Sequence, residues 1–344
     1  MSISEKIDKI ISIRNSKVES IENCFNFIKK FQSVISEFEY FRDNLKDNNL
    51  DSIKNIKTDK LKKDSEMIQK ELERLITRFS RPNIHLTFVG EMGAGKSLVM
   101  QRISGLGNEI IPSADGPSCT GAKSIITNTN DKNVKAKITF FTEDEIVEIV
   151  NNYLETIFGE GKISKVNSIM DIKKISINDL PKSKDESVKK NKKTHLENYI
   201  KHIDDFKEYL GEKDKIVKKD DIKKYVAQYN SKNTDEQYYN FLAVKEANIF
   251  CHFLSEDCGN IVLVDTVGLG ETSLGVENKM FEAVKNNADA IIYMVSPDLK
   301  RPDITEGDHE TLDKIIKQVT SEYTEKMLFW IVNKNNKDGK AEYK

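Results

Sequence analysis

The sequence lacks any cysteine pattern that would bind zinc or cross-link a small fold. Its four cysteines are Cys24, Cys119, Cys251 and Cys258; none belongs to a C-x-x-C pair, and the histidines are scattered. Zinc sites and disulfide frameworks both need ligands or half-cystines at characteristic spacings. We therefore expect neither kind of site, and reduced thiols such as a cytoplasmic protein carries.

Long apolar runs and an excess of charge of one sign are also absent. No apolar run approaches 18 residues, and the N-terminus has no signal-peptide core, whereas a membrane-spanning helix needs about 20 apolar residues. The 54 Lys and Arg nearly balance the 56 Asp and Glu, so the formal net charge is −2. This balance does not point to nucleic acid or to an anionic membrane as an obligatory partner. We expect a soluble, cytoplasmic protein whose membrane contact would be peripheral, and no nucleic-acid partner.

The first 80 residues predict helices. Apolar residues at three- and four-residue spacing favour one helix over 1–45 and a second from Thr58 to Phe79. Pro82 follows the second helix and disfavours its continuation. The apolar faces are too wide for helices isolated in water. A partner chain, a second copy or a missing C-terminal half would cover them; alternatively, they form a self-contained helical hairpin.

Strands and helices alternate from residue 81 onward, which predicts an open, mostly parallel α/β sheet with helices on both faces. Two strands, over 248–254 and 261–264, flank the turn 255–260 and are expected to form a hairpin. The remaining strands are expected at 84–89, 124–127, 134–141, 290–295 and 327–332, and helices at 98–103, 143–158, 277–284 and 306–319.

Residues 160–230 differ in composition from the rest of the chain, since they are rich in lysine, contain no arginine and have almost no glycine. Short apolar pieces within them indicate helices with solvated faces. We interpret this stretch as part of a helical insertion at about 143–244. The alternative, that its lysines touch acidic lipid or nucleic acid, stays open.

The strongest motif is Gly90–Ser97, GEMGAGKS, which fits G-x-x-x-x-G-K-[ST]. A polyphosphate needs many inward-pointing backbone N–H groups, and small residues let the backbone approach it closely. The following helix adds its positive end, Lys96 an ammonium for the β- and γ-phosphates, and Ser97 a hydroxyl for Mg²⁺. The residues expected to contact the nucleotide here are Gly90, Glu91, Met92, Gly93, Ala94, Gly95, Lys96, Ser97 and Leu98.

Two further elements complete a phosphate and metal site. Asp265 begins a D-x-x-G directly after an apolar strand; it is expected to hold Mg²⁺ through a water, while the Gly268 N–H contacts the γ-phosphate and senses its hydrolysis. Thr120, in a loop just before a strand, is expected to reach the metal. The metal set is thus Ser97, Thr120 and Asp265, and the catalytic set Lys96, Thr120 and Gly268. A plain strand-ending acid and a plain loop hydroxyl are the alternatives.

Asn333-Lys334-Asn335-Asn336 follows the last apolar strand, where GTP-binding proteins place N/T-K-x-D. The carboxylate of that motif accepts two hydrogen bonds from guanine, and the lysine stem packs on the base. Asn336 stands at the carboxylate position, so one contact would set donor against donor. Asn333, Lys334 and Asn336 are the candidate base-recognition residues, and guanine preference is less secure than phosphate binding.

The order of these motifs resembles the dynamin-like large GTPases of the bacterial type. The resemblance covers about residues 82–336 and implies an α/β, P-loop GTPase-type domain over 81–344 behind a stalk- or neck-like segment at 1–80. It further implies GTP and Mg²⁺ as cofactors, Mg²⁺-dependent GTP hydrolysis, self-association through the GTPase domain, and membrane remodelling.

The sequence departs from this family in two places. Dynamin itself has a water-positioning glutamine where Met92 stands, and the chain ends before the last strand and helix of such a domain, so the domain is expected to be incomplete at its C-terminus. The alternatives are a nucleotide-binding switch or an interaction protein with little or no hydrolysis.

Overall fold

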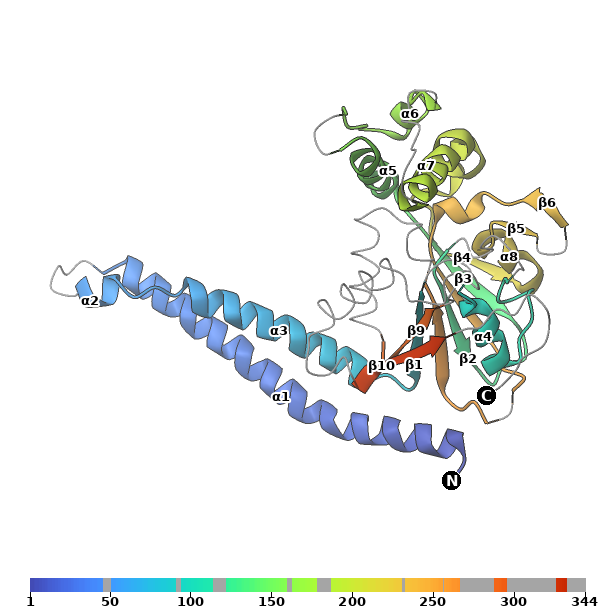
Figure 1. The fold of residues 1–344 in the computed structure, drawn as a ribbon. Helices are drawn as coiled ribbons and strands as arrows, with labels where there is room; N and C mark the ends of the chain where they lie inside the picture. The colour runs from blue at the N-terminus through green and yellow to red at the C-terminus, as the bar shows by residue number, and fades with distance from the viewer. Residues whose placement is uncertain are drawn as a thin grey trace. The chain divides into compact units, whose positions relative to one another are not determined.

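The computed structural model describes residues 1–45, 51–90, 94–113, 122–159, 163–177, 187–230, 233–255, 257–266, 288–295 and 326–332. The chain divides into two compact units, Met1–Ile84 and His85–Lys344 (Figure 1). The first is helical, and the second is built on a sheet.

In the first unit, α1 (Ile3–Asp43) packs along α3 (Asp59–Phe79), and the short α2 (Asp51–Lys54) lies between them in sequence (Figure 1). The two predicted helices are confirmed. A capping box starts α1, because the Ser2 hydroxyl accepts from the Glu5 N–H and the Glu5 carboxylate accepts from the Ser2 N–H; these bonds satisfy two backbone donors that have no partner inside the helix.

Polar contacts join the two sides of this helical hairpin at two places along its length. The buried Arg14 donates through Nη2 to the carbonyls of Arg81, at 3.1 Å, and Asn83, at 2.8 Å. Farther along, the Glu39 carboxylate accepts from Lys62 and Thr58, and these two bonds hold its pKa below the ordinary value. The hairpin register is therefore set by specific partners as well as by apolar packing.

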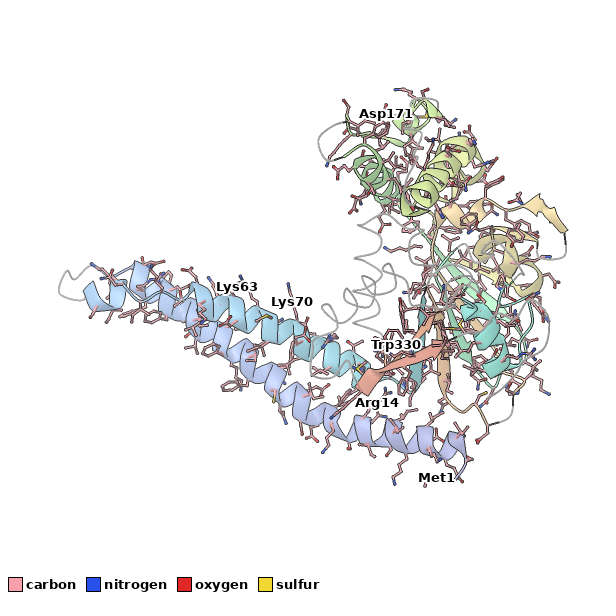
Figure 2. All side chains as sticks on the ribbon, in the orientation of Figure 1. Met1, Arg14, Lys63, Lys70, Asp171 and Trp330 are labelled. Carbon is pink, nitrogen blue, oxygen red and sulfur yellow. The ribbon has the colours of Figure 1, made fainter. Side chains whose placement is uncertain are left out.

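One stripe of α1 stays exposed. Phe27, Val34 and Phe41 lie seven residues apart and therefore on one side of the helix, and all three are exposed. By contrast, Lys63 and Lys70 extend from one side of α3 into solvent, as a surface helix requires (Figure 2).

The second unit contains an eight-stranded sheet with the order β10-β9-β1-β8-β2-β7-β3-β4. It is an α/β domain, as predicted. The strands are β1 (Ile84–Gly90), β2 (Ser124–Asn128), β3 (Lys135–Phe140), β4 (Lys215–Lys218), β7 (Val244–Cys251), β8 (Ile261–Asp265), β9 (Ala290–Val295) and β10 (Leu328–Val332).

The sheet is mixed rather than mostly parallel. Strand β9 runs parallel to β1 and β10, and β2 runs parallel to β7. Strand β2 is antiparallel to β8, and β3 is antiparallel to β7 and β4. The parallel half contains β1, the strand that leads into the P-loop region.

The predicted hairpin of β7 and β8 is wrong, because β2 lies between these strands. The turn joining them crosses the end of β2, where Asn128 satisfies its backbone: Nδ2 donates to the Gly259 carbonyl at 2.8 Å, and Oδ1 accepts from the Phe253 N–H at 2.9 Å. A turn signal in the sequence shows only that the chain reverses direction. The strands before and after such a turn can still be separated by a third strand in the sheet.

The sequence predicts a helical insertion, whereas the structure shows that it contains strands as well as helices. Strand β4 lies within it and forms the edge of the main sheet beside β3, and β5 (Tyr229–Asn230) pairs with β6 (Asn233–Gln237). Its helices are α5 (Glu143–Phe158), α6 (Ile169–Ile172), α7 (Ser187–Phe206), η3 (Lys207–Tyr209), α8 (Lys219–Val226) and η4 (Asn240–Ala243). They enclose a core of their own, in which Ile172, Leu196 and Phe206 are fully buried.

His195 of α7 makes the stability of this helical core dependent on pH. Its ring stacks on Tyr153, with centroids 6.3 Å apart, and burial lowers its pKa to about 4. The unfolded chain binds a proton near pH 6.5, whereas the folded one stays neutral, so stability falls as the pH drops from about 6.5 towards 4. Thermal unfolding of wild type and His195→Phe across this range should show a steeper acid loss in wild type; parallel curves would contradict the assignment.

Candidate functional site

The site begins where β1 ends at Gly90 and α4 (Lys96–Ser104) starts. Gly95 is the N-cap of α4 with a φ of 92°, a left-handed conformation that glycine adopts without strain. Gly90 faces β9 so closely that a Cβ there would lie 2.3 Å from the carbonyl oxygen of Met294. Both glycines are therefore required by backbone geometry.

Lys96 and Ser97, the first two residues of α4, are 8% and 9% exposed. The Lys96 side chain reaches the end of β1, where its Nζ donates to the Gly90 carbonyl at 3.0 Å. The ammonium is thus held at the point where β1 leads into the loop that the motif predicts to wrap a phosphate.

The carboxylate of Asp265 completes the described cluster. Strand β8 is buried along its length and delivers this residue at its C-terminal end, where it is 2% exposed. The Ser97 hydroxyl donates to Asp265 Oδ2 at 3.2 Å. Two segments 168 residues apart in sequence therefore meet here.

Thr266 is a positioning residue that sequence reasoning missed. Its buried hydroxyl donates to the carbonyl of Phe88 at 2.7 Å, which ties the end of β8 to β1. The bond fixes Asp265 relative to the strand that enters the loop. A threonine directly after the aspartate was the available signal, although its partner could not be read from the sequence.

Comparison with known proteins decides the family. The sequence model of the Dynamin family matches residues 86–334. The chain belongs to the dynamin family. The matched region runs from within β1 to the end of β10, so the second unit is a dynamin-family GTPase domain. No curated protein matches the sequence.

Two similar solved structures contain chains of an oligomerised bacterial dynamin pair, described as providing a mechanism for the long-range sensing and tethering of membranes. One is 14% identical with a TM-score of 0.37, over 79% of this chain and 28% of that chain. The other is 15% identical with a TM-score of 0.35, over 96% of this chain and 36% of that chain. This chain thus spans about a third of their length. Within the described residues, no helix is long and apolar enough to cross a membrane.

The dynamin-family structure brings together part of the predicted nucleotide site. Gly90, Ala94, Gly95, Lys96, Ser97 and Asp265 lie at the β1–α4 loop and the end of β8, whereas the Leu98 side chain is exposed on α4. The other predicted residues lie outside the described residues: Glu91, Met92, Gly93, Thr120, Gly268, Asn333, Lys334 and Asn336.

The residues present fit a magnesium-bound polyphosphate. The Ser97 hydroxyl and the Asp265 carboxylate are adjacent hard oxygen donors, the type that Mg²⁺ prefers. The described part of the chain holds no cluster of three or more His, Cys, Asp or Glu that would bind a metal alone. Mg²⁺ in such a site shares protein oxygens with substrate phosphates, so the described donors match a metal that arrives with a nucleotide.

Proposed function

We propose that the chain binds GTP together with Mg²⁺ and hydrolyses it. The observation that carries this proposal is the contact of Ser97 at the start of α4 with Asp265 at the end of β8, beside the buried Lys96. This arrangement places a hydroxyl, a carboxylate and an ammonium around one helix N-terminus, where the helix dipole favours an anion.

Each described residue has a distinct role in this proposal. The β1–α4 loop cradles the phosphates with its N–H groups, and Lys96 stabilises negative charge on the β- and γ-phosphates. Ser97 and Asp265 hold Mg²⁺, the aspartate through a water, and Thr266 keeps the carboxylate in place. When bound, Mg²⁺ supplies neutralisation of the phosphate charge that develops during transfer. Thr120 on the metal and Gly268 at the γ-phosphate complete the proposed set.

We further propose that Asn333, Lys334 and Asn336 contact the base, that GTPase domains self-associate when nucleotide is bound, and that the chain acts at a membrane as a peripheral protein. Membership of the dynamin family supports these three points. The exposed stripe of Phe27, Val34 and Phe41 supports a partner chain, or the family's C-terminal helical segments, as a cover for α1.

The test is phosphate release from GTP under single-turnover conditions, with enzyme in excess. We expect release with Mg²⁺ and none with EDTA, and a loss of about a hundredfold in Asp265→Asn. Asp257→Asn is the matched control, since Asp257 is exposed before the same strand and its φ of 60° suits asparagine. Failure to bind GTP with Mg²⁺, or unchanged release in Asp265→Asn, would refute the assignment.

A second function is favoured by one sequence observation. Met92 stands where dynamin carries its water-positioning glutamine, and an apolar side chain cannot orient a water. The chain would then act as a nucleotide-binding switch. Tight GTP binding without phosphate release in the same assay selects this alternative.

A further inference from the structure

Ser124 is the first residue of β2, and its side chain lies beside the carboxylate that ends β8. The antiparallel register of β2 and β8 places Ser124 directly opposite Asp265. Residues that are opposite in this way point to the same face of the sheet, with Cβ atoms about 4.5–5.5 Å apart. Ser124 is therefore adjacent to the proposed metal site, although no motif in the sequence marks it.

The hydroxyl of Ser124 is buried and only weakly bonded. Ser124 is 4% exposed. Within the described part of the chain its Oγ makes one hydrogen bond, which runs to the carbonyl of Ala122 and is 3.4 Å long. Good O–H···O bonds are about 2.7–2.8 Å long, and a buried hydroxyl without a good partner costs free energy. A further partner for this hydroxyl would therefore stabilise the site.

The neighbours of Ser124 on its face of the sheet point to the side of Asp265 for that partner. On the other side of β2, the parallel register places Ala247 of β7 next to Ser124. Ile126 follows two residues along β2, on the same face. Both neighbours are buried and apolar. Among these three neighbours only Asp265 has a polar side chain, and it already accepts from Ser97 at 3.2 Å.

The start of β2 is held in place by β7, so the Ser124 hydroxyl is positioned before any ligand binds. Lys123 pairs through Nζ with Oε2 of Glu246, and its carbonyl accepts from the Ala247 N–H at 3.0 Å. The other carboxylate oxygen of Glu246 accepts from Asn248 Nδ2 at 2.8 Å. Groups fixed in this way around a metal site orient its ligands and tune its affinity.

We propose that Ser124 is a positioning residue of the metal site, whose hydroxyl bonds to the water through which Asp265 holds Mg²⁺. The inference rests on the proposed function, because it needs the metal to bind with the nucleotide. Within the described residues no hydrogen bond joins Ser124 to Asp265 directly, and their separation across the ladder suits one bridging water. A hydroxyl can donate to this water or accept from it, so it orients the water without adding charge beside the phosphates.

The Mg²⁺ dependence of nucleotide affinity tests the proposal without relying on turnover. A fluorescent, non-hydrolysable GTP analogue is titrated into the full chain with excess Mg²⁺ and again with EDTA. The ratio of the two dissociation constants measures the contribution of the metal. We expect Ser124→Ala to lower this ratio by about tenfold and to leave the affinity in EDTA unchanged. Alanine keeps the small size of the side chain, so a serine present for its size alone would show no change.

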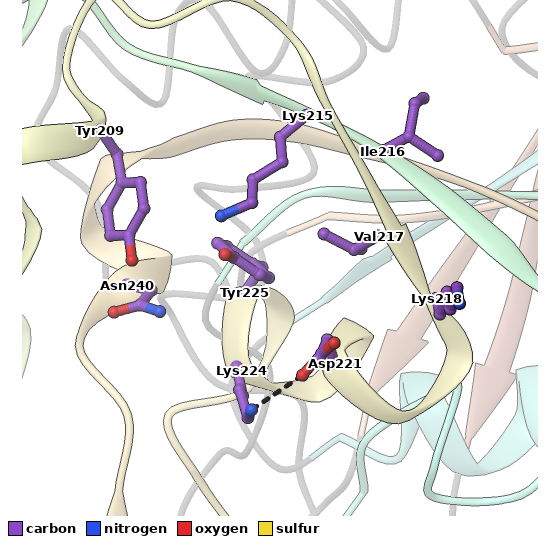
Figure 3. Close-up of a pocket in the computed structure, with 9 residues that line it drawn as sticks. All are labelled: Tyr209, Lys215, Ile216, Val217, Lys218, Asp221, Lys224, Tyr225 and Asn240. Carbon is purple, nitrogen blue, oxygen red and sulfur yellow. Dashed lines mark hydrogen bonds and ion pairs between the residues drawn. The ribbon is translucent and has the colours of Figure 1, made fainter.

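Matched controls separate this effect from a general one. Ser104→Ala removes another buried serine hydroxyl, which donates to the Met100 carbonyl at 2.7 Å at the far end of α4, and it should keep the wild-type ratio. Asp265→Asn should lose most of the contribution of the metal. Asp221→Asn should keep it, since Asp221 pairs with Lys224 in a surface pocket beside β4, at the edge of the sheet (Figure 3).

Failure of the proposed function and failure of the role of Ser124 give different results. If wild type does not bind the analogue, or binds it equally with Mg²⁺ and with EDTA, the proposed function fails and the role of Ser124 fails with it. If wild type and Asp265→Asn behave as expected but Ser124→Ala keeps the wild-type ratio, only the role of Ser124 is refuted. An equal loss in Ser104→Ala would also refute it, because a general effect of removing a buried hydroxyl would then explain the result.

Discussion

Replacing Lys96 with alanine is expected to lower the rate constant of GTP hydrolysis by about a hundredfold to a thousandfold and to weaken GTP binding at least about tenfold. Lys96 is 8% exposed, and its Nζ donates to the Gly90 carbonyl at 3.0 Å. The ammonium group is therefore already largely removed from solvent and held at the end of β1. A charge held in this way stabilises phosphate more than a surface lysine does, since no solvent must reorganise when charge develops.

Two measurements separate this effect from damage to the fold. Arg102→Ala removes a cation from an exposed position in the last turn of the same helix, and it should leave binding and hydrolysis unchanged. Thermal unfolding of Lys96→Ala should remain cooperative. Hydrolysis at the wild-type rate by a folded Lys96→Ala protein would show that the nucleotide does not bind at this loop.

Local sequence signals were sufficient where one segment determines its own structure. The helix predicted over 143–158 has those bounds, because Thr142 and Glu145 form a capping box at its start and Gly159 follows its end. The glycines at the end of β1 and at the N-cap of α4 were predictable from the motif, since Gly90 and Gly95 occupy positions that need glycine. The motif could thus place these two glycines before any tertiary contact was known.

Strand neighbours were not predictable in this way. The order of strands depends on pairing between distant segments, and the turn between β7 and β8 looks the same whether the strands are adjacent or separated by β2. The decisive residue, Asn128, lies more than a hundred residues earlier in sequence and bonds to that turn from β2. The same limit applies to Thr266, whose partner is a backbone carbonyl on β1.

Strand β4 was missed because the signal is too short. Lys215–Lys218 has only two apolar residues, and Ile216 is exposed while Val217 is buried against the sheet. A two-residue period cannot be recognised over four residues inside a lysine-rich stretch. Short edge strands with lysines also resist pairing with other chains. The short length and the lysines of β4, which prevented its prediction, are therefore consistent with its place at the edge of the sheet.

Replacing Gly90 with alanine is expected to destabilise the GTPase domain by about 3 kcal/mol or more. Gly90 pairs with Met294 in the parallel register of β1 and β9. The new Cβ would lie 2.3 Å from the Met294 carbonyl oxygen and 3.2 Å from its carbon. Both atoms belong to the backbone of a buried strand, so no side chain can move aside, and the two strands must separate or the loop must shift.

Gly211→Ala is the matched control, because Gly211 has a φ of +74° with nothing within 4 Å of the added Cβ; it should cost only about 1 kcal/mol. Chemical unfolding can be followed through Trp330, the single tryptophan, which meets Tyr293 of β9 at 5.0 Å in an edge-to-face contact. That contact reports on the strand against which Gly90 packs. Equal unfolding midpoints for the two variants would mean that β1 and β9 tolerate a side chain at Gly90, and that this glycine is kept for its conformation alone.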